Sequence, residues 1–270
     1  MKRVITGLLL VGLIVLNLAL LEKDPIYFAI LIAAMGALGV FEMTRALEDA
    51  LPTGLKALAL AYSLLLLPSY ILAGYTMEGV FLLTSVAVMA ALMFTSFNPA
   101  ASLSSLANFA LTLCYPALLL SFLYPLAYDA KALFLLVCVF GIGPMSDTMA
   151  YIVGSLLKGP KLCPAISPKK TISGAIGGLF GGIMAGIAIW AVFSRFFTHI
   201  AIPSVLVMAV IGLVGSAFTQ LGDLAESAVK RKLGVKDFGN LLPGHGGVLD
   251  RVDGIMFNAI FIYALFSYII

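Results

Sequence analysis

Apolar residues fill long stretches of this chain, and short segments with charged or turn-forming residues separate one stretch from the next. A helix needs about 20 apolar residues to cross the hydrocarbon core of a bilayer. The stretches are close to that length, so we predict an all-α polytopic membrane protein with about nine transmembrane helices. The predicted spans are residues 4–21, 25–42, 54–74, 78–96, 104–127, 132–157, 172–194, 203–229 and 252–270.

The composition excludes a soluble globular domain. Of the 270 residues, 62% are hydrophobic and 11% are charged, and the mean hydropathy is +1.11. Soluble domains carry about 25% charged residues, because water must solvate their surface. The three cysteines stand singly, with neither a disulfide framework nor a C-x-x-C metal pattern. We therefore expect the bilayer to be the solvent and membrane lipids to be partners.

The distribution of basic residues predicts how the spans are oriented. With nine spans, 13 of the 16 lysine and arginine residues fall on the side of the membrane that holds the N-terminus. Cytoplasmic loops carry an excess of these residues, so we expect the N-terminus in the cytoplasm and the C-terminus outside. The run after Met1-Lys2-Arg3 resembles a signal peptide, but no small-residue cleavage site follows it, and we expect a retained first span.

Charged residues are unevenly spread over what we expect to be a single membrane domain. Ten of them lie between Asp223 and Asp253, and four lysines lie between Lys158 and Lys170. Polar substrates need such charged loops, so the second half of the chain is the expected catalytic part. The expected parts are a lipid-facing scaffold at residues 1–130 and a catalytic half at residues 131–270, with cytoplasmic loops at 158–171 and 230–251, within one domain of residues 1–270.

A regular glycine pattern marks the seventh predicted span. Gly174, Gly178, Gly182 and Gly186 recur at every fourth residue. Small residues at this spacing let two membrane helices approach closely, so we expect tight helix packing. A substrate groove lined by glycine is the alternative interpretation.

Polar side chains line one helix face where the eighth predicted span ends. Asp223, Ser227 and Lys230 are spaced i, i+4 and i+7 and share a face, which Glu226 joins. A solvated helix end accounts for the basic residues, but not for two acids and a serine in one stripe. We therefore regard this face as a candidate site.

A second pair of acids begins the ninth predicted span. Asp250 and Asp253 are spaced i, i+3 and share a face. Ionisable groups at a membrane entry are costly to bury and are functional candidates. Two helices with carboxylates at one depth predict a Mg²⁺ site, because Mg²⁺ binds carboxylates together with substrate phosphates. The glycine-rich turn at 243–247 could also cradle phosphate through its backbone N–H groups.

Asp147 lies inside the sixth predicted span, 11 residues before Lys158 and so roughly 16 Å below the cytoplasmic exit. An acid at that depth needs a partner or a water-filled cavity. A structural ion pair and a role in the site both remain open. Pro144 lies three residues before it, directly after the Gly141-Ile-Gly143 run, and predicts a break or kink in this helix.

The run from Ser227 to Asp253 resembles the signature of phosphatidate cytidylyltransferases, the CDP-diacylglycerol synthases. The residues that fit the signature are Ser227, Lys230, Arg231, Lys236, Asp237, Gly239, Pro243, His245, Gly246, Gly247, Asp250, Arg251 and Asp253. An upstream block is also similar to the family and comprises Asp147, Thr148, Tyr151, Gly154, Ser167–Thr171 and Gly174. Met149 departs from the small residue expected there, and the first 130 residues match only as generic spans.

This resemblance implies Mg²⁺-assisted attack of the phosphate of phosphatidic acid on the α-phosphorus of CTP, which gives CDP-diacylglycerol and pyrophosphate. It implies metal ligation by Asp223 and Asp250, with Asp147 as a further candidate, for one or two cations. The implied catalytic residues are Asp223, Asp250, Lys230, Ser227, Arg231 and His245. The implied substrate-binding residues are Asp147, Lys169, Lys170, Lys236, Asp237, Gly246, Gly247, Arg251 and Asp253. We expect a bacterial plasma (inner) membrane location with the active site facing the cytoplasm, CTP and phosphatidic acid as partners and no nucleic acid, and we leave a homodimer open.

Two other functions fit part of the pattern. A CTP-dependent lipid kinase, acting on a polyprenol or phytol, would differ only in its hydroxyl acceptor. An ion-coupled transporter would explain buried acids, but it predicts internal repeats, whereas the polar residues here are confined to the C-terminal half. The sequence lacks a P-loop, since no Gly-Lys pair occurs in it, and it lacks the pattern of CDP-alcohol phosphatidyltransferases.

Overall fold

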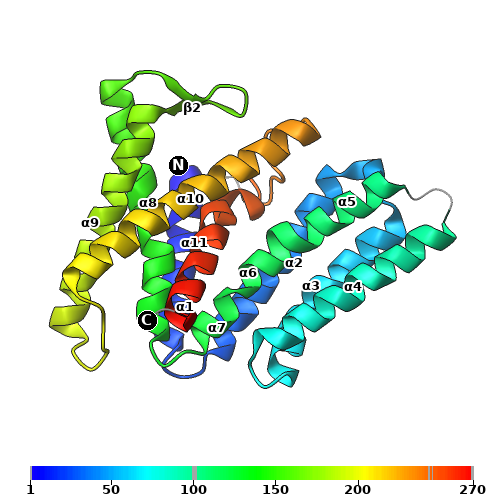
Figure 1. Ribbon diagram of the computed structural model, residues 1–270, viewed down its shortest axis with the longest axis horizontal. Coiled ribbons are helices and arrows are strands. Elements are labelled where there is room, and N and C mark those ends of the chain that lie inside the picture. The colour runs from blue at the N-terminus through cyan, green and yellow to red at the C-terminus, as the bar shows by residue number, and fades with distance from the viewer. Residues whose placement is uncertain (1, 99–101, 243, 245, 269–270) are drawn as a thin grey trace. The chain divides into compact units, whose positions relative to one another are not determined.

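The computed structural model describes residues 2–98, 102–242, 244 and 246–268, and most of these residues are helical (Figure 1). The α-helices are α1 Lys2–Leu20, α2 Ile26–Ala46, α3 Thr53–Leu72, α4 Met77–Phe97, α5 Leu103–Thr112, α6 Leu119–Ser121, α7 Leu123–Ala127, α8 Ala132–Leu157, α9 Ile172–Phe196, α10 Val205–Leu233 and α11 Leu249–Tyr268. The other elements are a 3₁₀ turn, Glu48–Ala50, a π-helical segment, Leu113–Leu118, and the strands β1 Lys161–Cys163 and β2 Ser167–Thr171.

The prediction of an all-α polytopic membrane protein is confirmed. Within the described residues, a helical segment lies at each of the nine predicted spans, and seven segments are long and apolar enough to cross a membrane. The other two are α1, whose apolar part is Thr6–Leu20, and α11, which begins with charged residues. The number of spans and the sides on which the termini lie stay predictions.

The helices form two compact units, and α11 runs from the first into the second. Unit 1 contains Met1–Asp129 and Val235–Arg251, and unit 2 contains Ala130–Gly234 and Val252–Ile270. In unit 1, α2 packs against α1, α3, α7 and the π-helical segment. Phe28, Tyr62, Tyr70, Phe109 and Tyr124 are among the largest fully buried side chains of unit 1.

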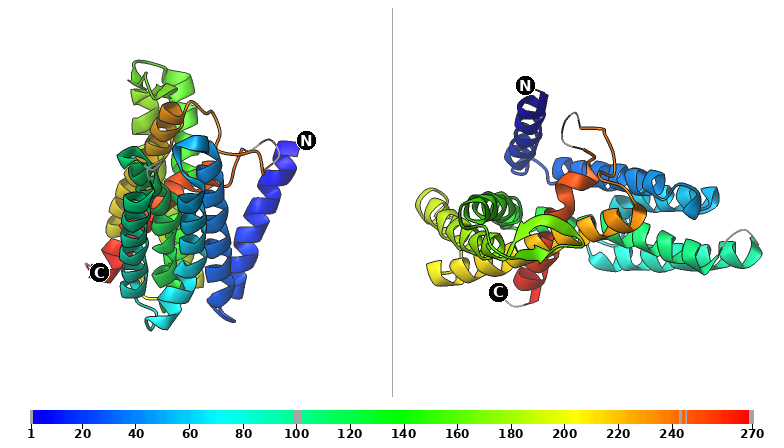
Figure 2. Two further views of the ribbon diagram at one scale, coloured as in Figure 1. Left: turned by 90° about the vertical axis from the view of Figure 1, so that its right-hand side faces the viewer. Right: turned by 90° about the horizontal axis from the view of Figure 1, so that it is seen from above.

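In unit 2, α9 lies beside both α8 and α10 (Figures 1 and 2). The glycine pattern of α9 makes this contact, as the sequence predicted. A Cβ atom added at Gly182 would overlap the backbone of Gly212 in α10, and one at Gly174 would lie 3.0 Å from the carbonyl oxygen of Ala150 in α8. The small residues therefore bring three helix backbones close together.

Pro144 does not break α8, which continues from Ala132 to Leu157 with the proline inside it, and the alternative prediction of a kink stays a prediction. Membrane helices tolerate proline where neighbours bind the backbone groups near it. Five and six residues before Pro144, Asn258 of α11 donates hydrogen bonds from Nδ2 to the carbonyls of Val139 and Cys138, at 3.0 and 3.3 Å, and so links α11 to α8. The irregular turn occurs instead in the fifth predicted span, in the π-helical segment that contains Pro116.

Residues 158–171, predicted as a loop, contain a β-hairpin. Strand β1 pairs antiparallel with β2, with Lys161 opposite Thr171 and Cys163 opposite Ser167. Thr171 then caps α9, because its Oγ1 accepts a hydrogen bond from the backbone N–H of Gly174 at 3.1 Å. The hairpin and the cap together fix the two lysines of β2 directly before α9.

Candidate active site

Three carboxylates from two helices meet in unit 2. Asp223 and Glu226 lie one turn apart in α10, and Asp253 lies in the second turn of α11. One oxygen from each of the three lies within 4.8 Å of the others, and Glu226 is buried while its neighbours are half-buried. All three donors are oxygens, the ligand type that Mg²⁺ takes, so these residues fit that ion.

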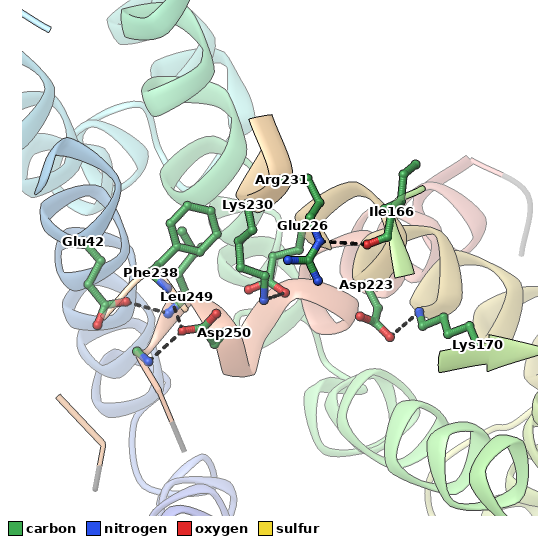
Figure 3. Close-up of polar contacts among 11 residues, drawn as sticks. Glu42, Ile166, Lys170, Asp223, Glu226, Lys230, Arg231, Phe238, Leu249 and Asp250 are labelled. Carbon is green, nitrogen blue, oxygen red and sulfur yellow. Dashed lines mark hydrogen bonds and ion pairs between the residues drawn. The ribbon is translucent and has the colours of Figure 1, made fainter. Parts of the chain in front are cut away.

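Two lysines balance most of this negative charge. Lys170 of β2 forms an ion pair with Asp223, and Lys230 of α10 pairs with Glu226 at 2.6 Å (Figure 3). The Glu226 side chain is only 3% exposed, so water screens its pair weakly. The cluster thus combines carboxylates that can bind a cation with ammonium groups that can bind a phosphate.

A pocket of about 400 Å³ adjoins Asp223, among α8, α9, α10 and the hairpin. Lys169 and Lys170 line it, as does Asp147, which is exposed and so has the cavity that its predicted depth requires. Most of the upstream block that resembles the family lines this pocket, namely Asp147, Tyr151, Gly154, Lys169, Lys170, Thr171 and Gly174. Gly174 packs against α8 and also lines this pocket, so the helix-packing interpretation is confirmed and the substrate groove stays a prediction.

The turn of the hairpin also contacts α10, in addition to the ion pair that Lys170 forms with Asp223. Nε of Arg231 donates a hydrogen bond to the carbonyl oxygen of Ile166 at 3.2 Å (Figure 3). Ser227 lies half-buried in α10, one residue after Glu226. The predicted phosphate contacts of Arg231 and Ser227 stay predictions.

In unit 1, the glycine-rich segment folds around Asp250. Its Oδ2 accepts hydrogen bonds from the backbone N–H groups of Phe238, at 3.0 Å, and Gly247, at 2.8 Å. Asp250 is 7% exposed, so these bonds are shielded from water. They give Asp250 a structural task in the segment, and its predicted role as a metal ligand stays a prediction.

A second pocket, of about 480 Å³, lies along this segment in unit 1. Its lining includes four of the predicted substrate-binding residues, namely Lys236, Asp237, Gly246 and Arg251. Lys236 and Arg251 are exposed cations, and an anionic group fits between such side chains. His245, predicted to contact phosphate, and Pro243 lie outside the described residues.

Sequence reasoning missed Glu42 of α2 altogether. This buried carboxylate accepts hydrogen bonds from the backbone N–H groups of Val248 and Leu249, within unit 1. The only sequence signal is an acid in the last two turns of an apolar helix, which solvation of the helix end would explain equally well. Glu226, placed on the polar face of α10 but given no role, was missed in part.

Comparison with known proteins places these residues in a family context. The model of the cytidylyltransferase family matches residues 1–269. The phosphatidate cytidylyltransferase of Bacillus subtilis (strain 168) is 33% identical over 283 aligned positions, which cover 98% of each chain. That of Brucella abortus biovar 1 (strain 9-941) is 42% identical over 128 residues, which is 47% of this chain and less than half, 45%, of the Brucella protein. That of Staphylococcus haemolyticus is 38% identical over 138 residues, 51% of each chain.

Proposed function

The chain belongs to the cytidylyltransferase family, and on that premise we propose that it transfers the cytidylyl group of CTP to phosphatidic acid, giving CDP-diacylglycerol and pyrophosphate. The observation that carries the proposal is the cluster of Asp223, Glu226 and Asp253 beside a pocket with two lysines. Such a site can hold a cation and a phosphate together. The names of the relatives support the choice of substrates.

The reaction joins two anions and needs no side chain as a general base. The lipid phosphate is largely ionised near pH 7, because the second pKa of a phosphate monoester is about 6. One of its oxygens forms a bond to the α-phosphorus of CTP. The bond from the α-phosphorus to the oxygen that bridges the α- and β-phosphates breaks, and its electron pair leaves with pyrophosphate. The barrier lies in charge repulsion and in the charge on the leaving group.

The lysines of the site address this barrier. Lys170 and Lys230 now pair with carboxylates, and in the reaction their ammonium groups donate to phosphate oxygens through charge-assisted hydrogen bonds. Lys169 lines the same pocket as Lys170 and adds a third positive charge. These cations hold the two substrates near one another and offset the charge on pyrophosphate.

We propose that Asp223, Glu226 and Asp253 hold Mg²⁺, with Asp250 and Asp147 as further ligands for one or two cations. The bound ion supplies positive charge to phosphate oxygens and so favours attack on phosphorus. The three carboxylates orient and retain the ion, and the ion pairs with Lys170 and Lys230 limit the excess of negative charge when it leaves.

The proposed location is the bacterial plasma (inner) membrane, with the site facing the cytoplasm. The skew of basic residues toward one side of the predicted spans supports this orientation. The bacterial origin of the relatives supports the assignment to a bacterial membrane. CTP is a cytoplasmic nucleotide and the lipid phosphate lies at the headgroup plane, so both substrates reach a site at that depth.

The test is an assay of the purified protein in detergent micelles with phosphatidic acid, Mg²⁺ and CTP labelled in the cytosine ring. We expect label to become extractable into organic solvent, and we expect Asp223→Asn or EDTA to abolish it. The matched control is Asp49→Asn, at an exposed acid of unit 1, which we expect to keep full activity. No extractable label from folded protein would refute the proposal, and transfer of γ-labelled phosphate to a polyprenol or phytol would identify a lipid kinase instead.

A further inference from the structure

Glu42 is a buried carboxylate in unit 1, 4% exposed, that binds a segment far away in the sequence. Its Oε1 accepts a hydrogen bond from the backbone N–H of Val248 at 3.0 Å. Its Oε2 accepts one from the N–H of Leu249 at 2.9 Å (Figure 3). Both oxygens of one buried side chain therefore hold two consecutive backbone amides.

These amides stand at the start of α11, which begins at Leu249. The first N–H groups of a helix have no acceptor within the helix, and they carry the positive end of its dipole. A carboxylate at this place satisfies two such groups through charge-assisted hydrogen bonds. Glu42 is thus an N-terminal cap of α11 supplied by another helix.

Two glycines of the segment, Gly239 and Gly247, allow its backbone to approach the Glu42 carboxyl group closely. A Cβ atom added at Gly247 would lie 2.6 Å from Cδ of Glu42, and one added at Gly239 would lie 2.9 Å from the same atom. Carbon atoms of two side chains do not approach so closely. Only glycine fits at either position while Glu42 keeps its place.

Asp250 depends on the same arrangement. It follows Leu249 directly, and its Oδ2 holds the N–H groups of Phe238 and Gly247. Glu42 and Asp250 therefore each accept hydrogen bonds from two backbone N–H groups within residues 238–249. If the pair held by Glu42 is released, the first turn of α11 and the carboxylate of Asp250 lose their fixed position.

We propose that Glu42 is a positioning residue for cytidylyl transfer, which sets the start of α11 and the place of Asp250 without touching either substrate. The inference rests on the proposed function, in which α11 carries Asp250 and Asp253. Loss of Glu42 is then expected to lower kcat by a larger factor than it raises the KM values for CTP and phosphatidic acid, because Glu42 touches neither substrate and the lysines of unit 2 keep their places.

Two variants of Glu42 test separately whether the carboxylate and the length of the side chain are required. Both partners of Glu42 are N–H donors, whereas the amide of Glu42→Gln has one acceptor and one donor group, so either orientation sets an NH₂ against an N–H. Glu42→Asp keeps both acceptors on a side chain one methylene shorter. The matched control is Thr44→Val, since Thr44 is equally buried in α2 but its hydroxyl donates to the carbonyl of Phe41 in the same helix.

The experiment combines steady-state kinetics with hydrogen exchange of the full chain in detergent micelles. For Glu42→Gln we expect kcat to fall roughly 10- to 100-fold, the range found for outer partners of site residues. We expect amides of residues 246–252 to exchange about 10-fold faster or more, while those of α2 stay protected. Glu42→Asp should retain more of both properties than Glu42→Gln, and Thr44→Val should match the wild type.

Wild-type kcat and wild-type exchange in Glu42→Gln would overturn the inference. So would faster exchange over the whole of unit 1, because Glu42 would then serve general stability rather than the start of α11. An equal loss of activity in Thr44→Val would have the same meaning. If the wild-type protein makes no CDP-diacylglycerol, the proposed function fails, and the exchange data still decide whether Glu42 holds this segment.

Discussion

Replacing Lys230 with methionine would test how strongly the ion pair in α10 stabilises the carboxylate cluster. Nζ of Lys230 lies 2.6 Å from the Glu226 carboxylate, and the two side chains are 15% and 3% exposed. Methionine keeps much of the length and apolar character of the lysine stem, so the change removes chiefly the charge. The Glu226 carboxylate would then remain buried beside Asp223 and Asp253 without this ion pair.

The size of the effect follows from the depth of the pair. At 2.6 Å and an effective dielectric constant of about 20, the attraction is about 6 kcal/mol, and desolvation of both groups offsets much of it. Removing one partner of a buried pair typically costs about 3–5 kcal/mol. Because the double variant Glu226→Gln/Lys230→Met leaves no buried charge at either position, we expect it to be less destabilised than the sum of the single variants, with a coupling energy of about 1–3 kcal/mol.

The assay is reversible unfolding in detergent micelles with EDTA present, for the wild type, the two single variants and the double variant. Since bound metal would compensate for the lost lysine, the chelator isolates the protein's own charges. A coupling energy below about 0.5 kcal/mol would refute the reasoning, because it would mean that water screens the pair as it does at a surface.

Three further predictions concern the metal, the helix packing and the hairpin. Mg²⁺ should raise the thermal midpoint of the wild-type protein in a concentration-dependent way and should not do so for Asp223→Asn, as followed by differential scanning fluorimetry. Gly182→Ala should lower the free energy of unfolding by about 1–3 kcal/mol, because the added Cβ would overlap the backbone of Gly212. The control Gly12→Ala should leave the free energy of unfolding unchanged, because no atom lies within 4 Å of its added Cβ. Equal effects of the two substitutions would contradict this packing. Arg231→Gln should make residues 161–171 exchange about fivefold faster by removing a hydrogen bond worth about 1 kcal/mol. Unchanged exchange would show that the remaining contacts of the hairpin, including the ion pair of Lys170, hold it without Arg231.

The spans and the family could be predicted from the sequence because both are local properties. An apolar stretch forms a helix in a bilayer whatever packs beside it, since its backbone groups must bond to one another. The resemblance of the run from Ser227 to Asp253 rested on residue types at fixed spacing, and the match of the cytidylyltransferase family to residues 1–269 confirms it. The same match, with the alignment to the Bacillus subtilis protein, extends the likeness to the first 130 residues, where the sequence showed only generic spans.

The carboxylate cluster could be predicted only in part. Helical spacing places Asp223 and Glu226 on one face, but the approach of Asp253 depends on how α11 packs against α10. Gly222 permits that approach, because a Cβ there would lie 2.5 Å from the carbonyl oxygen of Asp253. The partner Lys170 is brought to the cluster by a hairpin whose first strand has three residues, too few to show a periodic pattern.

The glycines between Phe238 and Val248 show how the structure changes the meaning of a pattern. Sequence reasoning assigned such glycines to phosphate binding through backbone N–H groups. In the structure, the N–H of Gly247 already bonds to Asp250, and the missing side chains of Gly239 and Gly247 make room for Glu42. Amides held by a buried carboxylate would bind a phosphate only at the expense of that bond. The N–H of Gly247 is therefore taken by Asp250, and Gly239 and Gly247 make room for Glu42, while the predicted substrate contacts of Gly246, Lys236 and Arg251 stay predictions.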